Sequence, residues 1–413
     1  MTRLTTGLAA LTSACAAFLV LLIYTPALDA PFLVPKFAVL NLTASLGFLV
    51  FAVQRAETNG LRWNRAVTAG VFLVLATSLL SWFIAANQPP GAPYAVAAMA
   101  RWGAFFGVAC GASLLADAPA ARQRVLEAVT IAAAVVAGIG LLQHVELWPL
   151  PIPVISKPGS TFGNRNLAAE VMAMGLPLGM GAAARSKQRD TRIVLRVSLA
   201  FELIYLAVTR TRGAWLAAAC ALGAALWLGR VRVSRPSLFG ALGVLFAAGL
   251  AATLPGRYNP RDAGDAKRYA GLLEVLHEGL DARSTALKTR FGLWRRSLSM
   301  VHDHPIWGVG PGNWPVIFPR YAEPGAMRDG VLSATLVPRQ AHDDPLERAA
   351  ETGLPGFAAL LFLVGAVATA ARHSLQTDDD ERPHIVAAAA SLVALAVLSL
   401  SSFPLEMPGT LAL

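Results

Sequence analysis

The chain has 413 residues, of which 55% are hydrophobic and only 15% are charged. Soluble domains carry roughly a quarter of charged residues, so this composition excludes an ordinary soluble protein and indicates a membrane protein. The formal net charge of +10 lies mainly in short loops between apolar stretches. It leaves no basic stripe for nucleic acid, and no nucleic-acid partner is expected.

Eleven apolar stretches are each long enough to cross the hydrocarbon core of a membrane, about 30 Å thick, as a helix. The sequence therefore predicts an all-α polytopic membrane protein with about 11–12 transmembrane helices. The stretches cover residues 7–27, 31–53, 66–86, 94–115, 123–143, 165–184, 192–209, 212–229, 237–254, 346–371 and 384–403. A twelfth span can begin after Pro404.

The spans divide the chain into three parts. Residues 1–254 hold nine spans, residues 255–345 form a large polar loop with amphipathic helices, and residues 346–413 hold the C-terminal spans. Alternate short loops are rich in arginine and lysine, which predicts that they are cytoplasmic. The polar loop then lies on the opposite side, in the periplasm of a bacterium with an inner membrane.

Cations inside or beside spans gather on the side of the large loop. An ionisable group inside a span costs roughly 2.5–3.5 kcal/mol on insertion scales and often marks function. These cations are Lys36, Arg101, Arg165, Arg210 and Arg212. Their convergence predicts an anionic ligand at the lipid boundary, whereas snorkelling to the interface is the alternative for Lys36 and Arg101. Glu202, in the middle of a span, is expected to pair with one of the arginines.

The segment around Asn164 and Asn166 opens the sixth span. Unpaired backbone N–H groups at a helix start attract anions, so these two asparagines and Arg165 are candidate binding residues. Plain helix capping is the alternative. Glu170 also lies near this end of the span.

Two amphipathic helices are expected in the polar loop. The first covers residues 267–281, and the second carries a stripe of Leu287, Phe291, Trp294, Leu298 and Val301. Arg290 lies beside that stripe, whereas Arg295 and Arg296 are expected to be solvated. The glycine- and proline-rich run from His304 to Trp314 predicts a rigid loop over the site.

His342 is the best candidate for a general base. Asp344 can cap the helix that follows, with Pro345 and Glu347 in its first turn. The helix dipole would lower the pKa of His342, and a neutral imidazole can accept a proton at neutral pH. A helix break is expected within residues 351–356. No spacing of His, Asp, Glu or Cys predicts a metal site, and no cofactor is expected.

These motifs together resemble the O-antigen ligase family, which shares a domain with O-antigen polymerases and protein O-oligosaccharyltransferases. The matching pieces are Gly163-Asn164-Arg165-Asn166, Thr211-Arg212-Gly213-Ala214-Trp215, residues 305–313, and His342-Asp343 followed by Glu351-Thr352-Gly353-Leu354-Pro355-Gly356. The resemblance covers roughly residues 160 to 405. The family usually has asparagine, serine or glutamine where Asp343 stands.

The resemblance implies a membrane-embedded glycosyltransferase of the C type. Such an enzyme moves a glycan from undecaprenyl pyrophosphate to an acceptor, here the lipid A–core oligosaccharide, at the periplasmic face. It assigns the essential arginines to Arg212 and Arg290, with Arg210 as a second arginine of the turn, and the essential histidine to His342. Membrane lipids, the lipid-linked donor and the glycolipid acceptor are its expected partners.

Three alternatives remain open from the sequence. Polymerisation of repeat units and transfer to protein use the same chemistry. A transporter for an anion or lipid, which belongs to another class, also uses buried cations and broken helices. The absence of a carboxylate pair placed for a double displacement favours a single displacement with inversion.

Overall fold

The computed structural model describes residues 18–26, 28, 30–57, 64–87, 91–115, 118–150, 152, 156–229, 247–250, 285–321, 338–377 and 381–413, together with 7 and 243–244. The expected amphipathic helix at 267–281 lies outside the described residues. So do most of the first span, 7–27, and most of the ninth, 237–254.

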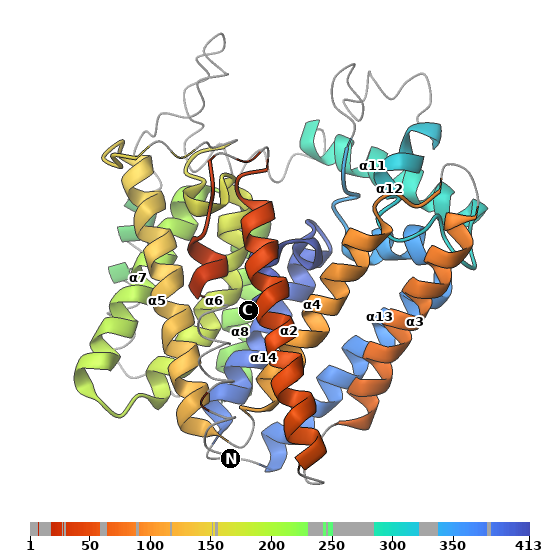
Figure 1. The fold of residues 1–413 in the computed structure, drawn as a ribbon. Coiled ribbons are helices and arrows are strands. Elements are labelled where there is room, and N and C mark those ends of the chain that lie inside the picture. The colour runs from red at the N-terminus through yellow and green to blue at the C-terminus, as the bar shows by residue number, and fades with distance from the viewer. Residues whose placement is uncertain are drawn as a thin grey trace.

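The described residues form helices and contain no strand, which confirms the all-α class (Figure 1). Their long helices are α2 (Leu33–Glu57), α3 (Arg65–Ala86), α4 (Ala95–Ser113), α5 (Pro119–His144), α6 (Arg165–Arg185), α7 (Arg189–Thr209), α8 (Arg212–Gly229), α11 (Thr285–Asp303), α13 (Asp344–Thr377) and α14 (Arg382–Ser399). The short ones are η1 (Ser160–Phe162), α12 (Trp314–Ile317), η3 (Phe318–Tyr321), η4 (Pro404–Glu406) and α15 (Pro408–Leu411).

Eight of the described helices are long and apolar enough to cross a membrane: α2, α3, α4, α5, α6, α8, α13 and α14. Each coincides with a span expected from the sequence. The seventh span forms α7, but that helix is too rich in charge to join the eight, because Asp190, Arg192, Arg196 and Glu202 all lie in it.

Helix α6 lies at the centre of one half of the bundle, packed by α5, α7, α8 and α14. In the apolar stretch of α6, 78% of the residues are buried inside the protein, whereas in that of α2 only 22% are. Glycine allows close packing here, because a Cβ on Gly181 would lie 2.5 Å from that of Ala387 in α14. The other half is built from two pairs, α2 with α4 and α3 with α13. This packing makes α6 a rigid support for whatever its ends carry.

Helix α13 contains the expected break, at Gly353. Its φ of 70° and ψ of −177° are not helical, and a Cβ there would lie 2.2 Å from the carbonyl oxygen of Ile306. Only glycine suits both conditions. The loop at 305–312 docks into the break through backbone bonds: Leu354 N–H donates to Pro305 O (2.8 Å) and Gly310 N–H donates to Glu351 O (2.8 Å). The loop is therefore fixed in place, as its glycines and prolines predict.

Helix α11 packs only part of its apolar stripe inward: Trp294 and Val301 lie against the core. Phe291 and Leu298 of the apolar stripe are 58% and 59% exposed, whereas Leu293 and Met300 are buried. Arg296 is also buried, contrary to the solvated position expected for it, and its Nη1 donates to Gly292 O (3.0 Å). The inward side packs on the start of α13 and on α12 and η3, where Leu293 and Met300 join Trp314, Phe318 and Ala350 in one cluster.

The residues after α14 do not form a further span. They turn through η4 and α15, and α15 packs back against α2 and α6. The prolines at 404 and 408 begin these short helices, since proline fits the first turn of a helix and cannot continue one.

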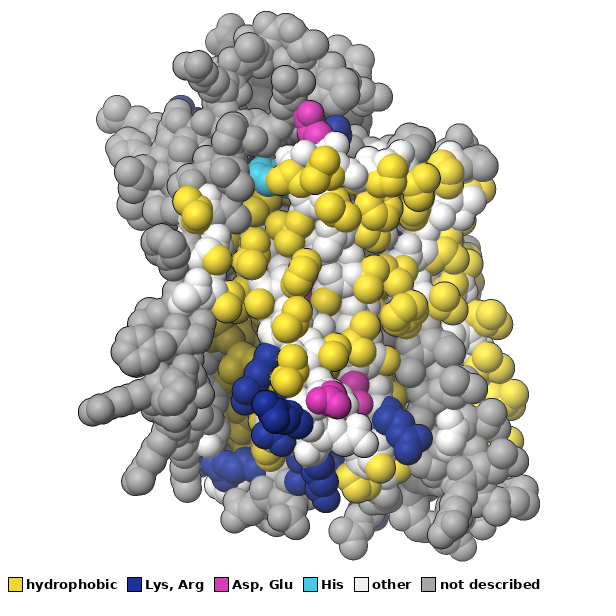
Figure 2. Space-filling view, turned by 90° about the vertical axis from the view of Figure 1, so that its left-hand side faces the viewer, with side chains coloured by type: hydrophobic (Ala, Val, Ile, Leu, Met, Phe, Trp, Pro, Cys, Tyr) yellow, Lys and Arg dark blue, Asp and Glu magenta, His cyan; other side chains and the backbone are white. Residues whose placement is uncertain are grey.

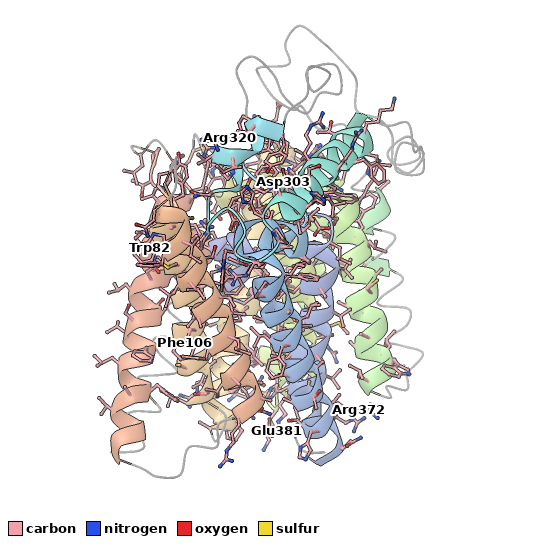
Figure 3. The ribbon with its side chains drawn as sticks, turned by 90° about the vertical axis from the view of Figure 1, so that its right-hand side faces the viewer. Trp82, Phe106, Asp303, Arg320, Arg372 and Glu381 are labelled. Carbon is pink, nitrogen blue, oxygen red and sulfur yellow. The ribbon has the colours of Figure 1, made fainter. Side chains whose placement is uncertain are left out.

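The two ends of the bundle differ in charge. Figure 3 shows α11 across one end, with Asp303 and Arg320, and Arg372 and Glu381 at the other end. On the face in Figure 2, the described side chains form an apolar band, with lysine and arginine gathered toward the Glu381 end. This distribution is typical of a protein that spans a membrane with one basic side.

Candidate functional site

His342 lies at the end of the bundle that α11 covers, in a backbone conformation fixed from both sides. Its φ is 56°, in the left-handed region that few side chains adopt. On one side Ala341 N–H donates to Glu347 Oε2 (2.6 Å), and on the other Asp343 Oδ1 accepts from Leu346 N–H (2.8 Å). Surrounding bonds of this kind are what maintains a strained position.

The capping residue of α13 is therefore Asp343, which corrects the prediction for Asp344. Asp344 is the first residue of the helix, and its Oδ2 accepts from Ser399 Oγ (3.0 Å) and Leu405 N–H (3.1 Å) instead. The sequence Asp343-Asp344 offers two carboxylates for one cap, and the tertiary position of the residues after α14 decides between them. Burial raises the pKa of Asp343, although the bond from Leu346 N–H opposes the shift.

The imidazole of His342 is held neutral. Its ring packs edge to face against Phe403, with centroids 5.0 Å apart. Burial, and then the charge of Arg290, lower the pKa of His342 to about 4. The direction agrees with the sequence prediction, but the causes differ, since desolvation and a neighbouring cation take the place of the helix dipole. A neutral imidazole at pH 7 has a free lone pair that can accept a proton.

Arg212, Arg290 and Glu170 form a charged group beside His342, from three different helices. Burial lowers the pKa of Arg290, the charge of Arg212 lowers it further, and Glu170 opposes both. Arg212 Nη1 is buried and has no hydrogen-bond partner among the described residues. Guanidinium groups remain charged at any accessible pH, so two neighbouring ones favour the binding of an anion between them.

The turn between α7 and α8 places Arg212. Arg210 ends α7 with a φ of 55° and is buried, so the chain reverses within three residues. Thr211 Oγ1 donates to Asn166 Oδ1 (3.0 Å), which ties this turn to the start of α6. Asn164 caps α6 by accepting from Asn166 N–H (2.9 Å). The two asparagines thus hold together the elements that carry Arg165 and Arg212.

Two predicted binding residues lie in other contacts. Lys36 is 1% exposed, and its ammonium donates to Val20 O (2.7 Å) and Leu21 O (2.9 Å) while it faces the ring of Phe162. Arg101 forms an ion pair with Glu406 (2.9 Å). Both cations are therefore satisfied within the protein, and neither joins the group at His342.

Glu202 forms no hydrogen bond with an arginine among the described residues. It is fully buried in α7, and neither carboxyl oxygen has a hydrogen-bond partner among the described residues. Its carboxyl faces α6, where a Cβ on Gly175 would lie 3.5 Å from Oε2. The expected pairing is wrong because Glu202 faces the neighbouring helices in the middle of the bundle and not the turn at its end.

The segment 401–406 is a part of the site that the sequence did not reveal. Phe403 contacts His342, Ser402 Oγ donates to Glu170 Oε1, Leu405 N–H bonds Asp344, and Glu406 pairs with Arg101. Its composition resembles the beginning of another span. Glu170 could have been found more easily from the sequence than this segment, because an acidic residue inside a span often marks function. Only the structure shows that it lies beside the arginines.

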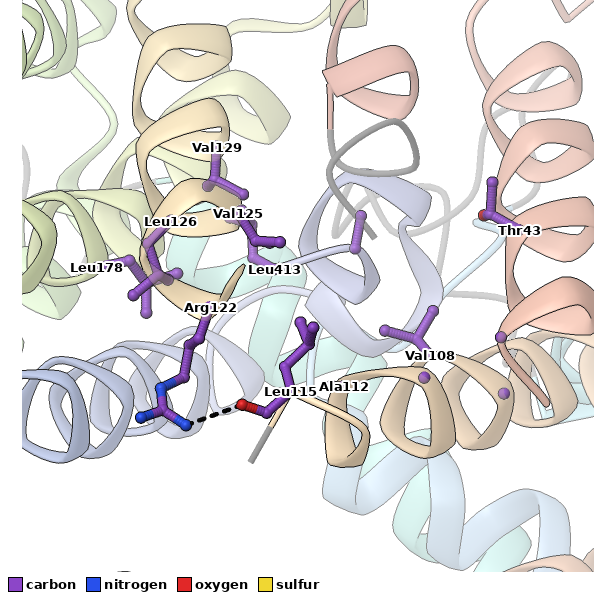
Figure 4. A pocket seen from close by; sticks show the side chains of 14 residues that line it. Thr43, Val108, Ala112, Leu115, Arg122, Val125, Leu126, Val129, Leu178 and Leu413 are labelled. Atoms are coloured by element: carbon purple, nitrogen blue, oxygen red, sulfur yellow. Dashed lines mark hydrogen bonds between the residues drawn. The ribbon is translucent and has the colours of Figure 1, made fainter. Parts of the chain in front are cut away.

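The opposite end of the bundle holds a cavity of about 200 Å³ that contains none of the predicted site residues. Figure 4 shows its mainly apolar lining, with Arg122 at one edge donating to Leu115 O (3.0 Å). Nearby, Glu381 accepts from Arg122 (2.5 Å), Arg185 (2.8 Å) and His384 (2.9 Å). Arg122, Arg185 and His384 thus all pair with Glu381.

The geometry can be set beside known proteins. A family model described as O-antigen ligase matches residues 197–361, which include Arg212, Arg290 and His342. No curated protein matches the chain significantly. The match confirms the family indicated by the motifs of the turn, the docked loop and the broken helix. The protein is thus a multi-pass, all-α membrane protein that carries the domain of the O-antigen ligase and polymerase type of membrane glycosyltransferases.

Proposed function

We propose that the protein transfers O-antigen polysaccharide from undecaprenyl pyrophosphate to the lipid A–core oligosaccharide, at the periplasmic face of a bacterial inner membrane. The observation that carries this proposal is the meeting of a neutral histidine with two partly buried arginines at one end of the membrane helices. The basic loops at the other end favour the orientation that makes this end periplasmic.

In the proposed reaction, a hydroxyl oxygen of the acceptor attacks the anomeric carbon of the donor sugar. His342 takes the hydroxyl proton as the new C–O bond forms. The bond from the anomeric carbon to the pyrophosphate oxygen breaks, and undecaprenyl pyrophosphate leaves with both electrons of that bond. Arg212 and Arg290 stabilise the charge on the leaving group, since guanidinium groups bind phosphate oxygens in pairs.

A single displacement of this kind inverts the anomeric centre. The two carboxylates that follow His342 in the chain fit inversion, because Asp343 is engaged in capping and Asp344 in bonds to Ser399 and Leu405. Arg210, Arg165, Asn164 and Asn166 are proposed to contact the donor, since they lie on the turn and helix start beside Arg212.

The test is reconstitution of transfer with purified protein in lipid nanodiscs, the lipid-linked glycan and the lipid A–core acceptor. Ligation predicts one glycan added to the acceptor with inverted configuration. Growth of the lipid-linked glycan without acceptor would indicate a polymerase instead. Product with unchanged anomeric configuration would contradict the single displacement.

A further inference from the structure

Among the described residues, Glu170 is the charged side chain beside Arg212 and Arg290 to which the proposed reaction gives no part. It lies in α6, five residues after the helix begins, and is 1% exposed. Its Oε1 accepts from Ser402 Oγ, whereas its Oε2 is buried without a hydrogen-bond partner among the described residues. A buried carboxyl oxygen that lacks a partner is rare and calls for an explanation.

The position of Glu170 is fixed independently of its charge. Ser401, next to Ser402, lies so close to the start of α8 that a Cβ on Gly213 would come within 3.2 Å of its Oγ. Phe403, on the other side of Ser402, packs on His342. Three consecutive residues therefore reach three parts of the site: Ser401 lies at the start of α8, which carries Arg212, Ser402 bonds Glu170, and Phe403 contacts His342. This arrangement holds the carboxyl group in the middle of the site.

The charge of Glu170 acts on the arginines through space. It opposes the lowering of the Arg290 pKa that burial and Arg212 cause. Among the described residues, no direct ion pair joins Glu170 to either arginine, and Arg212 Nη1 is still without a partner. The carboxyl thus reduces the net positive charge of the pair while it leaves guanidinium donors available for a ligand.

In the proposed reaction, a lower net positive charge beside the pyrophosphate favours release of the product. Donor and leaving group carry the same pyrophosphate, so any interaction that binds the donor through this group also binds the product. Binding of both states with equal strength lowers KM without raising kcat, and a product that dissociates slowly limits turnover. Two partly buried guanidinium groups with no carboxylate beside them would bind the product strongly.

We infer that Glu170 is a positioning residue whose negative charge lowers the affinity of Arg212 and Arg290 for pyrophosphate. The lower affinity allows the lipid pyrophosphate product to dissociate. This inference rests on the proposed function for the identity of the anion. Ser402 holds the carboxyl in place. The residue does not touch the reacting atoms, and it acts through the arginines alone.

The decisive variant is Glu170→Gln, which keeps the shape and the bond to Ser402 but removes the charge. We expect its Kd for inorganic pyrophosphate, measured by titration calorimetry in nanodiscs at about pH 8, where the wild-type carboxyl group is ionised, to fall on the order of tenfold. This is the size of effect expected when one neighbouring unit charge is removed. In the transfer assay, donor KM and kcat should both fall and inhibition by pyrophosphate should strengthen. A merely structural role predicts the opposite, a weaker affinity with a lower melting temperature.

Two controls separate charge from packing. Glu170→Asp keeps the charge and should keep a pyrophosphate Kd near that of the wild type. Ser402→Ala removes the bond but not the charge, and should change Kd by less than about threefold, since a net hydrogen bond contributes little. An unchanged or raised Kd in Glu170→Gln overturns the inference. If the wild-type protein showed no transfer activity while Glu170→Gln still bound pyrophosphate more tightly, the result would count against the proposed function and not against this inference.

Discussion

The charged side chains at the two ends of this helix bundle differ in how they are paired. At one end, Glu381 joins Arg122, Arg185 and His384 in a closed set of bonds. At the other end, Arg212 has a donor and Glu170 an acceptor without a partner among the described residues, and His342 has a strained backbone. Closed sets stabilise a fold, whereas unsatisfied and strained groups are maintained where a ligand completes them. The difference agrees with the proposal that the chemistry takes place at the His342 end.

The largest expected effect is that of His342→Ala. Loss of a general base lowers kcat by about 10²- to 10⁴-fold, whereas the fold loses only a half-buried ring. Rates of transfer and thermal unfolding, measured on the same preparation, test this. His302→Ala is the matched control, because His302 is an exposed side chain on α11, and it should leave both quantities unchanged. Full activity of His342→Ala would remove the base from the proposal.

Arg212→Lys and Arg290→Lys are expected to have the next largest effect. Lysine keeps the charge but loses the two-pronged contact with phosphate, so kcat/KM should fall about ten- to a hundredfold. Initial rates at varied donor concentration give the measurement. Arg295→Lys, an exposed change on α11, serves as the control. Kinetics that match the wild type in both variants would show that the paired contact is not made.

The pH profile is a smaller effect and tests the environment of His342. Since its pKa is lowered to about 4, the base stays neutral from pH 7 downward, and kcat/KM should decline only near pH 4. Bound pyrophosphate favours the imidazolium, so the decline of kcat itself should lie at higher pH. The contribution of the neutral ring to the free energy of unfolding is complete above about pH 6.5 and is lost as the pH falls toward 4. A decline of kcat/KM centred near 6.5 would mean that His342 is solvated.

Glu381→Gln should have the smallest effect on activity and a measurable one on stability. Burial would raise the pKa of Glu381, but the bond from His384 and the charges of Arg122 and Arg185 outweigh it and lower the pKa. Its removal should cost on the order of 1–2 kcal/mol, because the site is partly solvated. A melting temperature lower by a few degrees, with transfer within about twofold of the wild type, is expected.

The same variant has a pH signature. A carboxylate with a lowered pKa stabilises the fold above its ordinary value, and this contribution disappears as pH falls through the folded-state pKa. The difference in melting temperature between Glu381→Gln and the wild type should therefore shrink below about pH 4. Asp190→Asn, an exposed change at the start of α7, is the control. If Glu381→Gln reduced transfer as strongly as Arg212→Lys, the contrast between the two ends would not hold.

Much of the fold could be predicted because the membrane imposes it. Each of the eight membrane-length helices lies where an apolar stretch predicts one, since backbone groups in hydrocarbon must bond within their own segment. The break at Gly353 and the docked loop at 305–312 were also predicted, because glycine and proline restrict the backbone locally. The apolar stripe of α11 did not reveal which of its residues are buried, since the identity of its neighbours decides that.

The sequence by itself determined the helical membrane architecture, the family motifs and the three residues proposed for the chemistry. These depend on hydrophobicity, local backbone preference and residue type, which are properties of short segments. Only the tertiary structure decided that Lys36 and Arg101 are satisfied elsewhere, that Asp343 is the cap, and that residues 401–406 join Glu170 to the site. Those outcomes depend on which polar groups meet across some 230 residues of chain, as Glu170 and Ser402 do, and no local pattern encodes such a contact.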